Sequence, residues 1–398
     1  MYLVRLMIQK FASRAPSSVG EFLNRRTRAG PAPALIAAAL TGAAVGVAAC
    51  HRTPAQPSSP PPAEAQAAPP ASATLDRVRA RKRLKCGVTD NLPGFAERGL
   101  TGWRGFDVDL CRAVAAATLG DSHAVSIIGL SNKTRFAALE SGTVDLVAGG
   151  GTYTFTHDVT LGLDFVGVSF YDSQGFLTSA PKPPRRGQPS PPPKAIADLN
   201  GLRICVQGGS PAQKALADGL KQRGLSYQPI VKDDRQQALD AYQKRECDAL
   251  TDDLSVLAYA QAQLRDPDKH VIVAETLADD PVGPMVREGD DRWANVVRWT
   301  LNALILAEAA KVDSRTVDQA RQDSVDPQLR QLLGLDGDAG RRLGLASDWA
   351  YKAIRQVGSY GEIFDRNLGL NTPLKLDRGR NALWTADKPG QIYAPPLR

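Results

Sequence analysis

Short apolar runs alternate along the chain with longer stretches in which apolar positions recur at helical spacing. Over 106–119, Val108, Val114 and Leu119 return to one face of a helix, with Cys111 on the same side. The elements predicted around this helix are a strand over 84–88, a strand over 124–128, a helix over 132–141 that Gly142 ends, and a strand over 144–147. Strands that alternate with helices in this way predict a mainly parallel sheet.

The same alternation starts again after residue 200. The elements predicted there are a strand over 202–206, a helix over 211–218, a strand near Ile230, a helix over 235–244 and a strand over 249–250. Two such units in tandem predict two α/β lobes. Ligands of such sheets bind at the carboxyl ends of strands, where Thr89, 149–152, 207–210 and 251–253 fall. For the glycine run 149–151, the alternative is a tight strand-to-helix loop.

Two proline-rich segments flank or interrupt the first unit. The segment 53–74, TPAQPSSPPPAEAQAAPPASAT, holds too little apolar surface to form a core, so it is expected to be an extended tether. The segment 181–194, PKPPRRGQPSPPPK, falls inside the folded region. It is interpreted as a surface insertion or an interdomain connection.

The first fifty residues have the features of an export signal. Six basic residues precede an uncharged Ala/Leu/Val-rich run over 29–49, which stops at Cys50. The tetrapeptide 47–50 resembles the bacterial lipobox, which implies removal of 1–49 and diacylation of the Cys50 thiol. His51, rather than an Asp, then favours the outer membrane over the inner. The alternatives are a retained transmembrane helix and twin-arginine export.

The charge of the chain is concentrated in this leader. The formal net charge is +7, but 43 basic and 41 acidic residues remain once residues 1–49 are set aside. A near-neutral remainder without a basic stripe interleaved with aromatics predicts a poor nucleic-acid binder.

Four of the five cysteines divide equally between the two predicted lobes. An exported protein with one pair per lobe predicts the disulfides Cys86–Cys111 and Cys205–Cys247. The alternative is four buried, reduced thiols. The chain has four histidines and lacks a C-x-x-C motif or a Cys/His cluster, so no metal site is expected.

Several long stretches carry a family resemblance. They are 76–117, LGLDFVGVSFYDSQGF at 161–176, REGDDRWANVVRWTLNALILAE at 287–308, and the tail segments VGSYGEIFDRN and NALWTADKPGQIYAPPLR. Together they resemble the periplasmic general L-amino-acid-binding proteins of ABC importers, within the solute-binding proteins for polar amino acids. The resemblance covers roughly 75–398.

This resemblance implies a fold and its division along the chain. The fold is α/β, the two-lobe type II periplasmic-binding-protein fold, with a hinge of two crossover strands near 175–179 and 282–286. The implied parts are the signal peptide over 1–49, the tether over 50–74, the first lobe over 75–180, the insertion over 181–194, the second lobe over 195–281, and a return to the first lobe with a helical tail over 282–398.

In the first lobe, the resemblance implies ligand-binding residues by position. Gly150 and Thr152 fall in the loop that contacts the ligand, and Phe95 falls where family members contact its side chain. His157 occupies the position of an Arg that binds the ligand's α-carboxylate. Arg135 is interpreted as packing its own helix. A mostly neutral imidazole is a weaker partner for a carboxylate than a guanidinium.

In the second lobe, the resemblance implies the other half of the site. Ser210 falls in a loop at a helix N-terminus, and Asp253 matches the Asp that accepts hydrogen bonds from the α-ammonium. Asp252 precedes it, and alternation along a strand predicts that the two carboxylates point to opposite faces. With His157 in place of Arg, three readings stay open: weaker amino-acid binding, a different ligand such as an amine or a peptide-like molecule, and loss of binding.

The function implied is capture of an amino acid or a related small polar solute by hinge closure, for delivery to the membrane subunits of an ABC importer. The protein is expected to be a lipid-anchored, cofactor-free periplasmic monomer and not an enzyme. One alternative is a ligand sensor. Another is a dehydratase for cyclohexadienyl acids, which uses the same fold and would need His157 or Asp253 for proton transfer.

Overall fold

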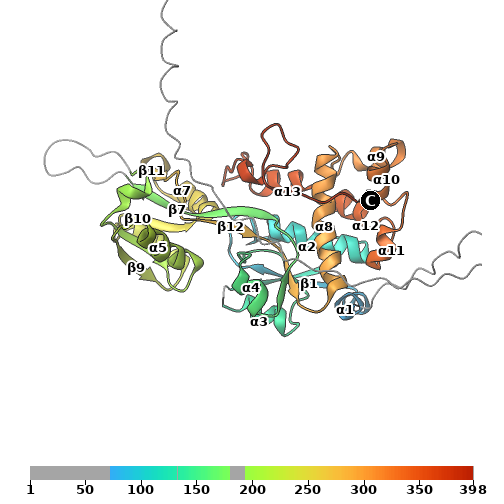
Figure 1. Ribbon diagram of the computed structural model, residues 1–398, viewed down its shortest axis with the longest axis horizontal. Helices are drawn as coiled ribbons and strands as arrows, with labels where there is room; N and C mark the ends of the chain where they lie inside the picture. Colours follow the sequence, from blue (N-terminus) through green and yellow to red (C-terminus); the bar gives the residue numbers. More distant parts are fainter. Residues whose placement is uncertain (1–71, 132, 180–192, 398) are drawn as a thin grey trace, which may run out of the picture. The chain divides into compact units, whose positions relative to one another are not determined.

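The computed structural model describes residues 72–131, 133–179 and 193–397 (Figure 1). The predicted signal peptide, Cys50 and almost all of the proline-rich insertion therefore lie outside the described residues. The described residues belong to one compact unit. Among them, no helix has both the length and the apolar character that crossing a membrane requires.

The first sheet has five strands in the order β4-β1-β5-β13-β6. β1 (Leu84–Thr89) pairs in parallel with β4 (Val125–Leu130) and with β5 (Leu146–Val147), as the strand-helix alternation predicts. β13 (Met285–Arg287) lies antiparallel between β5 and β6 (Leu163–Phe165). The chain thus returns to this sheet after completing the second one.

A long, buried helix covers the first sheet. α2 (Phe106–Leu119) has the predicted bounds, and its small side chains let it pack between the sheet and the later helices α8 (Asp291–Ala309) and α12 (Trp349–Val357) (Figure 1). The shorter elements of this part are β2 (Glu97–Gly99), β3 (Gly102–Arg104), α3 (Arg135–Glu140), α4 (Phe155–Thr160), α9 (Val317–Asp323), α10 (Pro327–Leu332), α11 (Ala339–Leu343), α13 (Tyr360–Asn367) and η3 (Gly379–Asn381).

The folded part begins slightly earlier than the predicted tether boundary. α1 (Ala73–Arg81) starts inside the segment expected to be extended. Ser72 caps it, since the Ser72 hydroxyl accepts a hydrogen bond from the backbone N–H of Leu75 at 3.1 Å. Asp290, far along the chain, accepts from the backbone N–H of Thr74 at 2.9 Å and ties this start to α8.

The second sheet is formed by six strands in the order β11-β7-β10-β8-β9, with β12 also pairing β7. Its parallel centre consists of the three strands predicted there, β8 (Arg203–Gln207), β9 (Gln228–Lys232) and β10 (Ala249–Asp253). The helices around it are η1 (Ile196–Leu199), α5 (Pro211–Gln222), α6 (Arg235–Gln243), α7 (Leu254–Gln263) and η2 (Pro267–Lys269).

Two strands connect the two sheets. β7 (Phe170–Ser179) follows β6 of the first sheet, and β12 (Ala278–Val282) precedes β13. They pair antiparallel from Phe170 opposite Val282 to Gln174 opposite Ala278. The far half of β7 pairs with β10 and with β11 (His270–Ile272). The two crossover strands therefore run side by side, which is the arrangement of a two-strand hinge.

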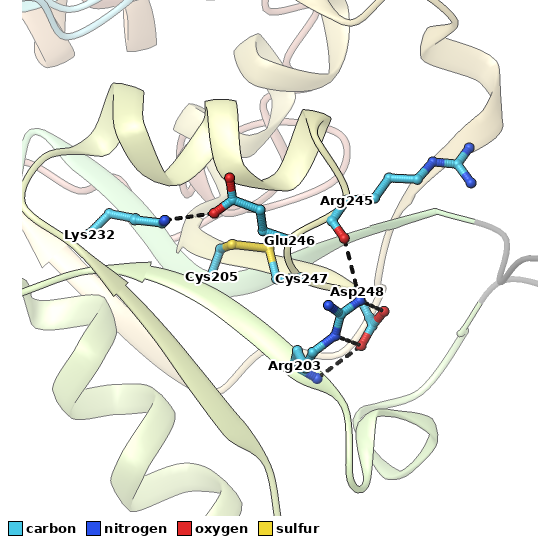
Figure 2. Close-up of a disulfide and its surroundings, with 7 residues drawn as sticks. All are labelled: Arg203, Cys205, Lys232, Arg245, Glu246, Cys247 and Asp248. Carbon is cyan, nitrogen blue, oxygen red and sulfur yellow. Dashed lines mark hydrogen bonds and ion pairs between the residues drawn. A yellow bond between two sulfur atoms is a disulfide. The ribbon is translucent and has the colours of Figure 1, made fainter.

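Both predicted disulfides are present, so the alternative of four reduced thiols is wrong. Cys86 of β1 bonds to Cys111 of α2, and Cys205 of β8 bonds to Cys247, which precedes β10 (Figure 2). Each bond joins a strand to a neighbouring segment within its own sheet-and-helix unit. All four cysteines are buried.

Candidate ligand-binding site

A cavity lies where the carboxyl ends of strands from both sheets meet the crossover strands. Its lining comes from three groups of elements. The first sheet and its helices contribute Thr89, Leu92, Phe95, Arg135, Gly150 and Thr152; the crossover strands contribute Phe170, Asp172, Asp280 and Val282; and the second sheet and its helices contribute Ser210, Pro211, Ala212, Arg235, Asp252, Asp253 and Ser255. The position at strand ends is the one that open α/β sheets use for ligands.

Aromatic rings form the apolar wall of the cavity. Phe95 is 4% exposed, and its ring packs edge-on against Phe170 at 5.0 Å and against Phe106 at 6.0 Å between centroids. Edge-to-face packing of this kind holds each ring in one orientation. Phe95 and Phe170 therefore offer a rigid apolar surface to a ligand.

The glycine run after β5 brings two loops into close contact. Gly150 has φ +77°, and a Cβ on it would lie 1.7 Å from the hydroxyl oxygen of Thr89. No side chain fits there, so a glycine is required. Thr89 is 7% exposed, and within the described part of the chain its hydroxyl has no hydrogen-bond partner.

Arg135 provides a buried cation at the cavity wall, which was not predicted from the sequence. It opens α3 and is 3% exposed, and its Nη1 donates a hydrogen bond to the carbonyl oxygen of Gly150. Burial lowers the pKa of Arg135 to about 10, while the negative charge of Asp253 acts in the opposite direction. The guanidinium is therefore still protonated at neutral pH. Arg135 therefore lines the cavity in addition to opening its helix.

His157 does not line the cavity. It lies in α4, where its Nδ1 is 2.8 Å from the carbonyl oxygen of Thr152. Its ring packs on that of Phe136, with 4.9 Å between the centroids. The helical turn that Thr154 caps sets this orientation, because the Thr154 hydroxyl accepts from the backbone N–H of His157. A ligand contact by His157 stays a prediction that the cavity geometry does not favour.

Two adjacent aspartates meet one arginine in the second lobe. Arg235 donates to Asp252 through Nε at 2.7 Å and Nη2 at 3.1 Å, and its Nη2 lies 3.6 Å from Asp253. The expectation that Asp252 and Asp253 point to opposite faces is therefore wrong. The chain leaves β10 at Asp253 and enters α7 at Leu254, so strand alternation ends there.

Burial and neighbouring charges act strongly on the pKa of Asp253. Removal from bulk water, and then the charges of Asp172 and Asp252, raise the pKa of Asp253 well above its usual range, while Arg235 opposes them. Burial would lower the pKa of Arg235, but the charge and hydrogen bonds of Asp252 raise it above its ordinary value. Asp253 is thus a carboxylate whose charge a bound cation would stabilise.

Ser210 has a structural role in addition to its place at the cavity. Its hydroxyl accepts from the backbone N–H of Gln213 at 3.2 Å and donates to the carbonyl oxygen of Gln207 at 2.8 Å. It therefore caps α5, a helix of twelve residues whose N-terminus meets the cavity at Pro211 and Ala212. Helix N-termini favour negative groups.

The crossover strands add two more carboxylates. Asp172 of β7 accepts from the Ser255 hydroxyl at 2.5 Å and from the Ser173 backbone N–H at 2.8 Å. Asp280 of β12 accepts from Nε2 of Gln174 at 2.7 Å, and the same nitrogen donates to Asp253. Asp172 and Asp280 are each 8% exposed. The sequence analysis singled out neither residue, because the cluster forms only when β7 pairs with β10 and β12.

Comparisons with known proteins agree with the architecture. Residues 84–313 match the family described as bacterial extracellular solute-binding proteins, family 3. The chain is 42% identical over 328 residues to the general L-amino acid-binding periplasmic protein AapJ of Rhizobium johnstonii, covering 82% of this chain and 93% of that one. It is 40% identical over 328 residues to the glutamate/glutamine/aspartate/asparagine-binding protein BztA of Rhodobacter capsulatus, with 82% and 94% covered.

A solved structure extends the likeness to three dimensions. A periplasmic binding protein of an ABC transporter from Brucella ovis, with glutathione bound, is 42% identical, with a TM-score of 0.75. The match covers 82% of this chain and 99% of that one. The chain belongs to the bacterial extracellular solute-binding proteins of family 3, and its fold is that of the type II periplasmic binding proteins.

Proposed function

We propose that this protein captures an amino acid in the cavity between its two sheets and delivers it to an ABC importer. The observation that carries the proposal is the pairing of opposite charges across the cavity. Arg135 lies on the side of the first sheet and Asp253 on the side of the second, and both line the cavity. An α-amino acid is a zwitterion, so its carboxylate and ammonium match these two groups.

The ligand's carboxylate would lie near Arg135, Thr152 and the N-terminus of α5, since all of these offer positive charge or donors. Its ammonium would lie against Asp253, which accepts hydrogen bonds. Phe95 would contact the side chain. Because the two charged ends are held by different lobes, binding would draw the lobes together about the crossover strands.

The names of the relatives support an amino-acid ligand and a transport role. AapJ is named for general L-amino acids, BztA for four acidic or amide amino acids, and the Brucella ovis structure holds glutathione. We therefore include a small γ-glutamyl peptide among the ligands to be tested. The dehydratase alternative is not favoured, because these relatives are named as binding proteins.

A thermal-shift screen of the purified chain tests this function. The ligands are the twenty amino acids, glutathione and simple diamines. A ligand that binds only the folded state at 100 times its Kd should add about 2.7 kcal/mol to the free energy of unfolding. A concentration-dependent rise in Tm with at least one amino acid is expected. If none of the twenty amino acids raises the Tm at millimolar concentration, the proposed function is wrong.

We also propose that Cys50 carries the lipid that holds the protein to a membrane, with the periplasm as its compartment and the monomer as its state. Acyl chains contribute about 0.8 kcal/mol for each buried CH₂ group. The change Cys50→Ser should move the protein from the detergent phase to the aqueous phase in detergent partitioning, with the unfolding temperature unchanged. A mutant that stays in the detergent phase would instead indicate that the apolar run over 29–49 is retained.

A further inference from the structure

The charged side chains that line the cavity do not balance. Four aspartates face two arginines there: Asp172, Asp252, Asp253, Asp280, Arg135 and Arg235. With every group ionised, the lining carries two more negative than positive charges. A neutral zwitterion leaves this excess unchanged, an acidic amino acid increases it, and a cationic amino acid reduces it.

The excess is concentrated on the crossover strands. Arg235 is engaged by Asp252 through two hydrogen bonds. Asp172 and Asp280, in contrast, accept hydrogen bonds from the uncharged donors described above, the hydroxyl and amides of Ser255, Ser173 and Gln174. Arg235 acts on Asp172, and Arg380 on Asp280, only through space.

A second observation concerns buried polar side-chain atoms in and beside the cavity. The hydroxyl oxygen of Thr89 and the carbonyl oxygen Oε1 of the Gln174 side chain are buried and have no hydrogen-bond partner among the described residues. Gln174 bridges Asp253 and Asp280, whereas Thr89 lies on the side of the first sheet, beside Gly150. Buried polar atoms are rarely left without partners in native structures. An ammonium group has three donors and no acceptor, so one that lies against Asp280 and Asp253 can supply the hydrogen bond that Oε1 of Gln174 lacks.

We propose that the preferred ligand is an amino acid with a cationic side chain, such as lysine or ornithine. This inference rests on the proposed function. Its second positive charge would lie against Asp172 and Asp280, while Asp253 and Arg135 hold the α-ammonium and α-carboxylate. The preference would differ from that in the name of the relative BztA, whose ligands have acidic or amide side chains.

The protonation of this cluster predicts a pH dependence. Burial raises the pKa of Asp172 to about 6, opposed by its hydrogen bonds from Ser255 and Ser173 and increased by Asp280. A bound cation lowers that pKa, so protons and ligand compete. Lysine affinity is therefore greatest above pH 6 and declines as the pH falls through it. Asp253, Asp280 and Arg235 face the same region and contribute to the midpoint.

Calorimetric titration of the full chain with lysine, glutamine and glutamate at pH 7.5 tests the inference. We expect lysine to bind most tightly, by about tenfold or more over glutamate, because one ligand relieves the negative excess and the other adds to it. Tightest binding of glutamine or glutamate would overturn the cationic preference and leave the proposed function standing. If none of the three ligands binds, and no amino acid of the full panel binds, the proposed function itself is wrong.

Asparagine variants locate the second positive charge. Asp172→Asn and Asp280→Asn should each lower lysine affinity by about tenfold or more and change glutamine affinity by less than about threefold. The matched control is Asp279→Asn, since Asp279 neighbours Asp280 on β12 but is 67% exposed and paired with Arg380 outside the cavity lining. The control should bind both ligands as the parent chain does.

Unfolding of the unliganded variants separates binding from structure. Raised pKa values mean that the ionised carboxylates of Asp172 and Asp280 are disfavoured in the folded state, so the asparagine variants should unfold at the same or a higher temperature. Equal losses of lysine and glutamine affinity, accompanied by a lower unfolding temperature, would assign the two aspartates a structural role and overturn the inference.

Discussion

Replacing Arg135 with methionine is expected to lower amino-acid affinity by about 30- to 1000-fold, the equivalent of about 2 to 4 kcal/mol. The ligand's carboxylate would lose a buried donor that is charged at neutral pH and belongs to a residue only 3% exposed. Methionine keeps much of the volume of the stem, so the variant should still fold. Titration with lysine and glutamine measures the loss.

Two controls make this prediction specific. His157→Phe keeps the ring packing on Phe136 and should change affinity by less than about threefold, because His157 does not line the cavity. Cadaverine, which is lysine without the carboxylate, should bind the Arg135→Met variant at least as tightly as the parent chain, because the variant lacks a positive charge in the cavity lining. A large loss in His157→Phe with little loss in Arg135→Met would reverse the assignment and restore His157 as the carboxylate-binding residue.

His157 and Arg135 show why a binding site cannot be fully predicted from positions in a sequence. Position along the chain suggested His157, but the side chain's direction depends on how α4 leaves the Thr152 loop. Arg135 was interpreted as packing because it opens a helix beside an aromatic residue. Its burial at the cavity follows from the contact with Gly150, which brings together loops after different strands. No local sequence pattern indicates that contact.

The fold was more predictable because apolar periodicity determines which face of each element is buried. The helix over 106–119 and the strands of both parallel centres lie where that periodicity placed them. The errors have local causes. α5 continues past its predicted end at 218 to Gln222, and Gly219 lies inside the helix, packed against Leu277. A side chain at this position would force Leu277 to shift, because its Cβ would lie 2.6 Å from a methyl carbon of Leu277.

β10 illustrates how burial of polar residues escapes an apolar pattern. The strand was expected over 249–250, but it extends to Asp253. Thr251 is buried because its hydroxyl donates to the carbonyl oxygen of Gly175 at 2.8 Å, and Asp252 is buried because Arg235 pairs with it. Both partners come from distant segments. The polar end of the strand is therefore stabilised by tertiary contacts, and this end lines the candidate site.

Removing the disulfide of the second lobe should have the largest effect on stability. The double change Cys205→Ala and Cys247→Ala opens a loop of 42 residues, which corresponds to about 4 kcal/mol in the free energy of unfolding, when the cost is taken as loop entropy. The neighbouring pair Arg203–Asp248 cannot replace it (Figure 2). That pair is about 40% exposed on each side, so it contributes roughly 0 to 1 kcal/mol.

The same loop links this disulfide to the binding site. It contains α5 and α6, which bring Ser210 and Arg235 to the cavity, so its release should also weaken ligand binding, through greater freedom of both helices. Denaturant unfolding of the double variant, with and without a bound amino acid, measures both effects. The matched control is Cys86→Ala with Cys111→Ala, whose separation of 25 residues corresponds to about 3.5 kcal/mol. If both double variants unfold at the same denaturant concentration as the parent chain, neither disulfide contributes to stability and the prediction is wrong. In that case a reducing agent would also leave the unfolding of the parent chain unchanged.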